Sequence, residues 1–191
     1  MDFKHLSSEA LFLADNLALD FINTQYGTGD EQRDCLEDDR SVTGWLEKAG
    51  LVPTGTEAPA GLLAEARQLR NAARAVVYAA MRPAAADPTP INAILEAGRP
   101  EQRLQWDEDT QRYHVEFHSS AHSPASLLWP IADALVKLVT DDKFVYVRQC
   151  EATDCILLFH DLSKSHRRRW CSMSTCGNRM KVAAFRERKK A

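Results

Sequence analysis

The amino-acid sequence predicts an α+β protein in two parts: a mostly helical N-terminal domain with one β-hairpin, residues 1–142, and a small treble-clef-like module, residues 143–191. Apolar residues recur three and four positions apart along most of the first part, and they alternate with polar residues around only one turn. Four of the five cysteines lie in the second part. The charge divides at the same boundary, because residues 143–191 carry twelve Lys/Arg and four Asp/Glu.

Three helices are expected in the first half of the N-terminal domain. Residues 16–25, 41–50 and 62–82 each place apolar side chains at helical spacing. Ser41 is suited to cap the start of the second helix, and Pro83 ends the third because proline cannot continue a helix. These segments therefore predict a helical layer that buries one face of each helix.

The second half of the domain mixes helices with a hairpin. Residues 89–98 form a short helix that begins with a Thr–Pro pair and closes at a glycine. Apolar and polar residues then alternate over 104–106 and again over 113–117, with the sequence DEDT between them, which predicts a β-hairpin with a four-residue turn. Helical spacing returns over 123–142, where Pro130 is expected to kink the helix.

Hydropathy and cysteine content indicate the compartment. No apolar run reaches the roughly 18–20 residues that a membrane span requires, so no membrane association is expected. The start of the chain is too polar and too acidic for the apolar region of a signal peptide. We therefore expect a cytoplasmic protein, where disulfides are uncommon and paired cysteines indicate a metal site.

The cysteine pattern predicts a structural zinc site. Two pairs, each with four residues between its members, are separated by fifteen residues, and four thiolates suit the closed tetrahedron of structural Zn²⁺. Two buried pairs of free thiols, or a redox pair, are the alternatives. His160 and His166 lie close in sequence, which leaves a mixed ligand set open, whereas Cys35 reads as a small apolar filler. The proposed ligands are Cys150, Cys155, Cys171 and Cys176.

The spacing of the two pairs also predicts the shape of the module. Residues 156–161 are rich in β-formers, so the fifteen-residue spacer is interpreted as a short hairpin that brings the pairs together. The second pair leads into a helix expected from about Ser174 to Arg188, where Gly177 would allow the backbone to approach the ion. Because so short a segment buries little apolar surface, zinc is expected to supply much of its folding free energy.

The basic residues of the module suggest a polyanion partner, although a solvated tail would show the same charge. Asn178 and Arg179 are the best candidates for contacts with base edges, and the loop arginines would bind phosphates. Two structural alternatives remain open: Asn178 could hydrogen-bond at the helix start, and arginines could donate to the zinc-bound sulfurs. The candidate nucleic-acid-binding residues are Lys164, Arg167, Arg168, Arg169, Asn178, Arg179, Lys181 and Arg186.

The residues of this module resemble the CGNR-type zinc finger. The sequence CGNR stands complete at Cys176–Arg179, and WCSM precedes it from Trp170. NLALDFINTQ and WLEKAGL in the first part look like the ABATE domain that precedes this finger in bacterial transcription regulators linked to stress. The resemblance implies a DNA-binding finger with the four cysteines as ligands, joined to a sensing or regulatory domain. Many relatives are expected to have an aspartate-rich segment where this chain has His160 before Asp161, which would put an imidazole near the metal.

Other functions remain as alternatives to a DNA-binding regulator. The zinc module could serve an RNA-binding or protein–protein adaptor. We expect no enzyme, because no nucleophile–base pair or phosphate-binding glycine loop emerges from the sequence. Asp20 and Asn23 form a polar side of the first helix, where they could line a site for a small effector or satisfy helix ends and loops. A homodimer would help a single small finger to bind DNA tightly.

Overall fold

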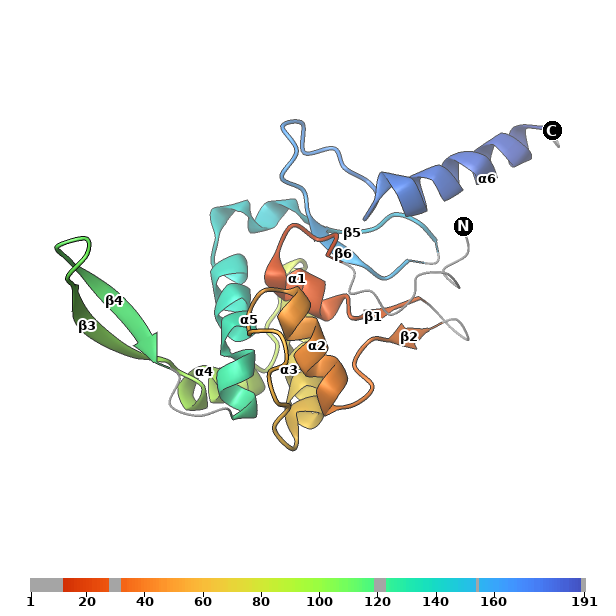
Figure 1. Cartoon of the computed structure of the whole chain (residues 1–191). Coiled ribbons are helices and arrows are strands. Elements are labelled where there is room, and N and C mark those ends of the chain that lie inside the picture. Colours follow the sequence, from red (N-terminus) through yellow and green to blue (C-terminus); the bar gives the residue numbers. More distant parts are fainter. Residues whose placement is uncertain (1–11, 28–31, 119–122, 154, 190–191) are drawn as a thin grey trace.

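The computed structural model describes residues 12–27, 32–118, 123–153 and 155–189 (Figure 1). Helix α5 lies at the centre of the helical body and contacts α1, α3 and α4, while α2 packs on α3. Within the described residues, no helix has both the length and the apolar character needed to cross a membrane. The helices are α1 (Leu17–Ile22), α2 (Asp39–Lys48), α3 (Leu62–Ala80), α4 (Thr89–Ala97) and α5 (Pro124–Val139).

Side-chain caps mark where α1, α2 and α5 begin. The predicted cap at Ser41 is wrong by one turn, because Asp38 caps α2 and the Ser41 hydroxyl accepts hydrogen bonds from the backbone at its start. Ser123 and Ser126 form the same reciprocal arrangement at the start of α5. Pro130 lies inside α5, as expected from the sequence.

The N-terminal domain contains two hairpins. Strands β3 (Glu101–Asp107) and β4 (Arg112–His118) pair in the predicted antiparallel hairpin, which projects away from the helices (Figure 1). Its turn occupies residues 108–111, one position later than expected, because Asp107 pairs with Arg112. The sequence did not predict the two-residue strands β1 (Gln25–Tyr26) and β2 (Arg33–Asp34), which are too short to show a periodicity.

The C-terminal module contains one hairpin and one helix. Strand β5 (Val147–Gln149) pairs with β6 (Leu158–His160), a π-helical turn covers Met173–Gly177, and helix α6 spans Asn178–Arg188. The expected hairpin within the spacer is therefore wrong in its partner, since β6 pairs with the strand before the first cysteine pair. The predicted strand and C-terminal helix are both present, and the α+β class is confirmed.

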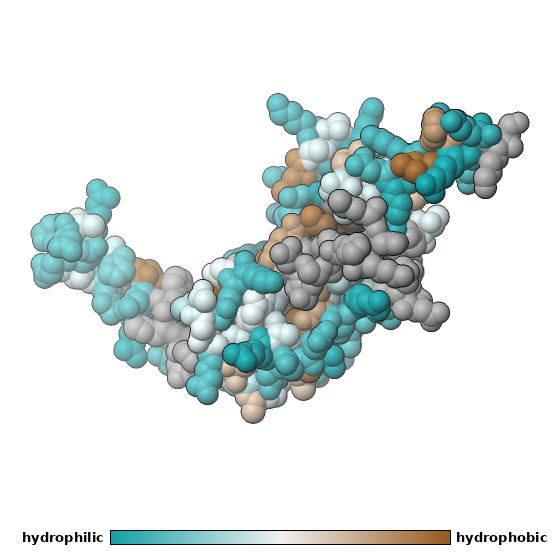
Figure 2. Space-filling view, turned by 45° about the vertical axis from the view of Figure 1, so that its right-hand side comes forward, coloured by the Kyte–Doolittle hydropathy of each residue, from teal (hydrophilic) through white to brown (hydrophobic). Residues whose placement is uncertain are grey.

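The two ends of the module differ in burial. Leu157, Leu158 and Phe159 lie in the same hydrophobic core as the body helices, where β6 contacts α1. Helix α6, in contrast, has no buried residue and extends away from the body (Figure 1). Figure 2 shows mostly hydrophilic residues along this projecting end, with a few hydrophobic side chains among them. These exposed apolar residues include Val182 and Phe185.

Candidate metal centre

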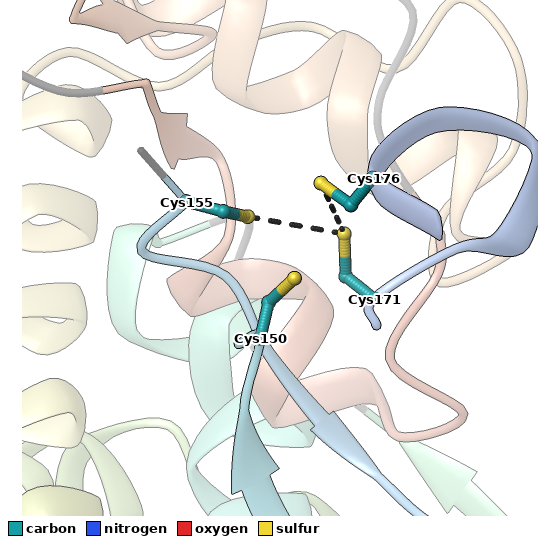
Figure 3. Close-up of side chains that lie close together, drawn as sticks. All are labelled: Cys150, Cys155, Cys171 and Cys176. Atoms are coloured by element: carbon teal, nitrogen blue, oxygen red, sulfur yellow. Dashed lines mark hydrogen bonds between the residues drawn. The ribbon is translucent and has the colours of Figure 1, made fainter. Parts of the chain in front are cut away.

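The four cysteines of the C-terminal module converge on one point (Figure 3). All four Sγ atoms lie within 4.8 Å of one another, and all four residues are buried. The Sγ atoms of Cys155 and Cys171 are 3.9 Å apart, and those of Cys171 and Cys176 are 3.5 Å apart. The fold thus brings together two cysteine pairs that are separated by fifteen residues in the sequence, as the sequence pattern predicts.

The spacing of the sulfurs fits zinc and excludes disulfides in this arrangement. A tetrahedron with Zn–S bonds of about 2.3 Å has sulfur–sulfur edges of roughly 3.8 Å, close to the distances observed, whereas a disulfide requires about 2.05 Å. Four buried thiols are the complete donor set of a closed structural zinc site. We therefore assign the cluster as a zinc site.

The sulfurs also affect one another's ionisation. Hydrogen bonding to Cys150, and then to Cys155 and Cys176, raises the pKa of the Cys171 thiol. Hydrogen bonds from the other three cysteines lower the pKa of Cys150. Four adjacent thiolates therefore require a cation to neutralise them, and zinc binding must release protons. Affinity for the metal falls as the pH falls.

Local backbone hydrogen bonds place the first cysteine pair. Cys150 follows β5, and its N–H donates to Leu157 O at 2.9 Å across the hairpin. The Cys155 N–H donates to Ala152 O at 3.0 Å, which closes a tight turn between the two ligands. The pair therefore lies at the end of a hairpin whose other side enters the body core.

The second pair is placed by the turn that begins α6. Gly177 donates its N–H to Ser172 O at 3.0 Å. A Cβ atom at Gly177 would lie 2.8 Å from Sδ of Met173 and 3.1 Å from the Trp170 ring, so either side chain would have to shift to admit a larger residue. Glycine suits this turn because it packs between these two side chains. A π-helical turn within a helix is a feature often found at functional sites.

Neither candidate histidine joins the cluster. His160 Nε2 lies 3.1 Å from Lys143 O, and its ring belongs to the contact between β6 and the body. His166 Nδ1 lies 2.9 Å from Asp161 O, and its ring stacks on Tyr146 with centroids 3.7 Å apart. The cysteines alone make up the group of metal-binding atoms found in the part of the chain that the structure describes.

Asp161 organises the spacer between the cysteine pairs. Its Oδ1 accepts hydrogen bonds from the N–H and hydroxyl of Ser163, and its Oδ2 accepts from the Arg168 N–H at 2.8 Å. Desolvation opposes ionisation, but these hydrogen bonds outweigh it and lower the pKa of Asp161. Sequence reasoning did not assign this role, because spacing alone does not identify a carboxylate that binds its own loop.

Arg168 connects the spacer to the start of the body. Its Nη1 lies 2.6 Å from Oδ2 of Asp15, and its Nη2 donates to Leu13 O at 2.8 Å and also to Cys171 O. Its Nε donates to Trp170 O, and its guanidinium lies 4.4 Å from the centre of the Phe159 ring. The side chain is thus engaged within the chain and holds the residue beside Cys171 in place.

Among the other candidate residues, Arg179 contacts a zinc-site sulfur and the rest are exposed to solvent. Arg179 donates to Sγ of Cys176 at 3.4 Å, the sulfur contact that the sequence left open. Arg169 is exposed and pairs with Glu151 at 2.5 Å. Asn178 is exposed, and its amide contacts Ser174 O at 3.5 Å. The remaining exposed candidates are Lys164, Arg167, Lys181 and Arg186.

Asp20 and Asn23, the candidate effector ligands, lie inside the protein. Asp20 accepts hydrogen bonds from the N–H groups of Leu13 and Ala14, both at 2.9 Å, and burial raises its pKa to about 6. Asn23 donates to Leu158 O at 2.8 Å and accepts from the Leu158 N–H at 2.9 Å. Both side chains therefore connect segments of backbone, the second alternative that the sequence left open.

Comparison with known families agrees with this organisation. Residues 15–142 match the ABATE family, described as "Putative stress-induced transcription regulator", and residues 146–189 match the CGNR zinc finger. The first match covers more than half of the chain, and together they confirm the resemblance inferred from the sequence. A comparison with curated proteins gives no match.

Proposed function

The chain belongs to the ABATE family of stress-induced transcription regulators and carries a CGNR zinc finger, and from this premise we propose that it binds duplex DNA through helix α6 and the spacer loop. The family is one of regulators rather than enzymes. One observation carries the proposal: a basic helix without a buried residue begins at the zinc site and extends from the body. Such a helix has the dimensions to enter a major groove.

The charge of α6 favours a polyanion. Residues 178–189 contain five Lys/Arg and one Glu, and each of the basic residues except Arg179 is classed as exposed. Val182 and Phe185 on this helix are exposed, whereas Met180 packs against the buried core. The helix is therefore anchored near the cysteine cluster and presents the rest of its length to a partner.

One face of α6 offers the side chains that read bases. Asn178, Val182 and Arg186 are spaced four apart and therefore lie along one side of the helix. They line a groove of about 470 Å³ that begins at Ser174 on the preceding turn. Asparagine amides suit adenine and arginine suits guanine in the major groove. We assign base contact to Asn178 and Arg186, and support of the zinc-bound sulfur to Arg179.

Phosphate contacts are assigned to the exposed cations around this face. Lys164, Arg167 and Arg169 lie on the spacer between the cysteine pairs, and Lys181 lies on α6. Such contacts position a protein on the duplex without reading its sequence. Arg168 is left out of this set because its guanidinium is bound to Asp15 and to backbone carbonyls.

The N-terminal domain is proposed to regulate the finger through their shared contact. Asn23, which caps the C-terminus of α1, bonds both backbone groups of Leu158 on β6, and Ala14 O accepts from the His160 N–H at 2.8 Å. A small effector that changed the position of α1 would therefore also move β6, the strand of the finger that contacts the N-terminal domain. Asp20 and Asn23 would transmit such a signal rather than bind the effector.

The test is binding of the zinc-loaded full chain to duplex DNA over a range of salt concentrations. Affinity should fall steeply with salt, and Lys181→Ala should reduce the slope of log K against log salt by about one. Arg186→Ala should weaken binding, and Arg40→Ala, an exposed arginine on α2, is the matched control that should not. Absence of binding at about 50 mM salt, where electrostatic contacts are strong, would contradict the proposal.

The same experiment distinguishes the adaptor alternative. Single-stranded RNA is added as a competitor to the DNA complex. If the RNA displaces the labelled DNA at the same concentration as unlabelled duplex DNA, or at a lower one, the module binds RNA instead. Equal loss of binding in Arg186→Ala and Arg40→Ala would indicate nonspecific attraction to charge.

A further inference from the structure

A pocket of about 510 Å³ lies on the N-terminal domain beside helix α5. Its walls come from residues that follow α2, from residues that follow α4, and from one side of α5, which α4 contacts (Figure 1). The volume falls within the roughly 300–1,000 Å³ of sites that hold small organic molecules. We call this cavity the α5 pocket. Its apolar wall consists of Leu51, Val52, Pro100, Leu127, Trp129 and Pro130.

The apolar wall of the α5 pocket is held in place by the core of the domain. Leu127 is buried, and Leu51 and Val52 pack against the buried core. Lys137, which also lines the pocket, lies about 180° around α5 from the fully buried Leu128. Helix α5 therefore packs on the body with one side and presents the other side to the pocket, so a ligand can occupy the pocket without disturbing the core.

Two charged residues of α5, Asp133 and Lys137, complete this side of the pocket. Nζ of Lys137 lies 2.7 Å from Oδ2 of Asp133, but the exposed fractions of the two side chains differ, at 75% for Lys137 and 28% for Asp133. An ion pair one turn apart on a helix surface contributes little stability, because water screens it and the long lysine side chain loses rotamer freedom. The Lys137 ammonium can therefore turn into solvent at small cost, whereas the Asp133 carboxylate stays in the wall.

The chemistry of this wall favours a positively charged ligand. Trp129 lies one turn before Asp133 on the same side of α5. A carboxylate attracts an ammonium group directly, and the face of an indole ring attracts it through the ring quadrupole. The domain as a whole adds to this preference, because residues 1–142 carry twelve Lys/Arg and twenty-three Asp/Glu. The field of such a domain concentrates cations rather than anions.

We propose that the α5 pocket binds a small organic amine whose ammonium group displaces that of Lys137 from Asp133. The apolar part of the amine packs on the apolar wall, and the Trp129 ring lies beside its charge. A neutral compound of the same shape gains only the apolar contacts. An organic anion faces the Asp133 carboxylate and is bound still more weakly.

The position of the pocket suits an effector site. Helix α5 contacts α1, and α1 contacts β6 of the finger. A displacement of α5 by a bound amine would therefore reach Asp20 and Asn23, the side chains that connect α1 to other segments of backbone. This regulatory use rests on the proposed function, whereas the binding of the amine does not.

An NMR titration of the zinc-loaded, isotope-labelled full chain with phenethylamine tests the proposal without DNA, so its outcome is independent of DNA binding. The amide signals of residues 126–137 should shift in a saturable way, with a dissociation constant of about 1 mM because the probe has few atoms. Phenethyl alcohol, which has a hydroxyl in place of the ammonium, should bind about tenfold more weakly, and hydrocinnamate, which has a carboxylate there, should bind no better than the alcohol.

Two substitutions on α5 should change the affinity for phenethylamine in opposite directions. Asp133→Asn removes the charge that holds the ammonium and should weaken binding by about tenfold. Lys137→Ala removes the competing ammonium and should strengthen binding by about two- to fivefold. Neither change should alter the affinity for phenethyl alcohol. Glu96→Gln, the same loss of one negative charge at an exposed residue of α4, is the matched control and should have no effect.

Far-UV circular dichroism and zinc content verify that each variant folds. Equal affinity for the amine and the alcohol, or no saturable shift among residues 126–137, would overturn the proposal. Weaker binding of the amine in Lys137→Ala would also overturn it, as would an equal loss in Asp133→Asn and Glu96→Gln, which would indicate general attraction to an acidic domain.

Discussion

The two halves of the zinc finger are stabilised in different ways. Strands β5 and β6 lie against the body, where Leu158 is buried and bonded on both backbone groups by Asn23. Helix α6 has no buried residue and lies apart from the body (Figure 1). Cys150 and Cys155 belong to the first half, and the other two ligands belong to the second. A zinc ion held by all four sulfurs would join the two halves, and Arg168 connects them as well, through its hydrogen bonds to Trp170 O and Cys171 O.

In the proposed function, this difference separates the residues that fold the module from the residues that bind DNA. The β5–β6 hairpin is stabilised by burial and by hydrogen bonds that do not depend on the metal. Beyond Met180, which packs against the core, the helix exposes charged and scattered apolar residues that can be used for binding. A substitution in the β5–β6 hairpin should lower the free energy of unfolding, whereas a substitution on α6 should weaken the binding of DNA.

The largest effect is expected when a ligand in the second half is removed. Cys171→Ser should abolish stoichiometric zinc binding and unfold residues 171–189, because structural zinc supplies about 10–16 kcal/mol to finger peptides. The body helices and the β5–β6 hairpin should keep their structure. Limited proteolysis with mass spectrometry would locate cleavage beyond the spacer.

Cys35→Ser is the control for this change, since Cys35 lies on the body and outside the sulfur cluster. It should retain one zinc per chain. Equal protection of α6 in Cys171→Ser and in the wild type would show that the helix does not depend on the metal.

A smaller loss of stability is expected from Arg168→Ala. The change removes hydrogen bonds to Asp15, Leu13 O, Cys171 O and Trp170 O together with the contact on Phe159. Breaking a partly buried network of this kind costs about 3–4 kcal/mol in free energy of unfolding. Denaturant unfolding would measure it. Arg167→Ala, an exposed neighbour, should stay within about 0.5 kcal/mol of the wild type.

The third effect depends on pH and arises at Asp20 on α1, in the N-terminal domain. Burial raises the pKa of Asp20 to about 6 from its usual 3.8, so the folded chain holds a proton that the unfolded chain has released between these values. The free energy of unfolding should therefore fall as the pH rises from about 4 to 6, by about 3 kcal/mol in total. Asp20→Asn keeps an acceptor for Leu13 and Ala14 and should flatten this dependence. An unchanged difference between the two proteins across this range would contradict it.

The sequence predicts the parts of the site that depend on local spacing. The two cysteine pairs, the C-terminal helix and the projecting hairpin follow from residue types at short separations. The pairing of β6 was missed because its partner, β5, has only three residues, and because α1 lies far away in sequence. No short-range pattern indicates that Asn23 meets Leu158, 135 residues later.

The roles of the arginines show the same limit. Arg167, Arg168 and Arg169 are equivalent in sequence, yet one is bound to Asp15, one pairs with Glu151 and one is exposed. The direction of each side chain depends on how Asp161 folds the spacer, through hydrogen bonds within the loop that residue spacing does not reveal. Charge density alone identified the segment but not the residue that serves the fold.

Hydrogen exchange of the full chain with and without zinc tests the connection between the two halves most directly. Removal of zinc by a chelator should abolish protection across residues 173–188, while the amide of Leu158, bonded to Asn23, should remain protected. Loss of protection in β5 and β6 to the same extent as in α6, or retained protection of α6 without zinc, would contradict the account.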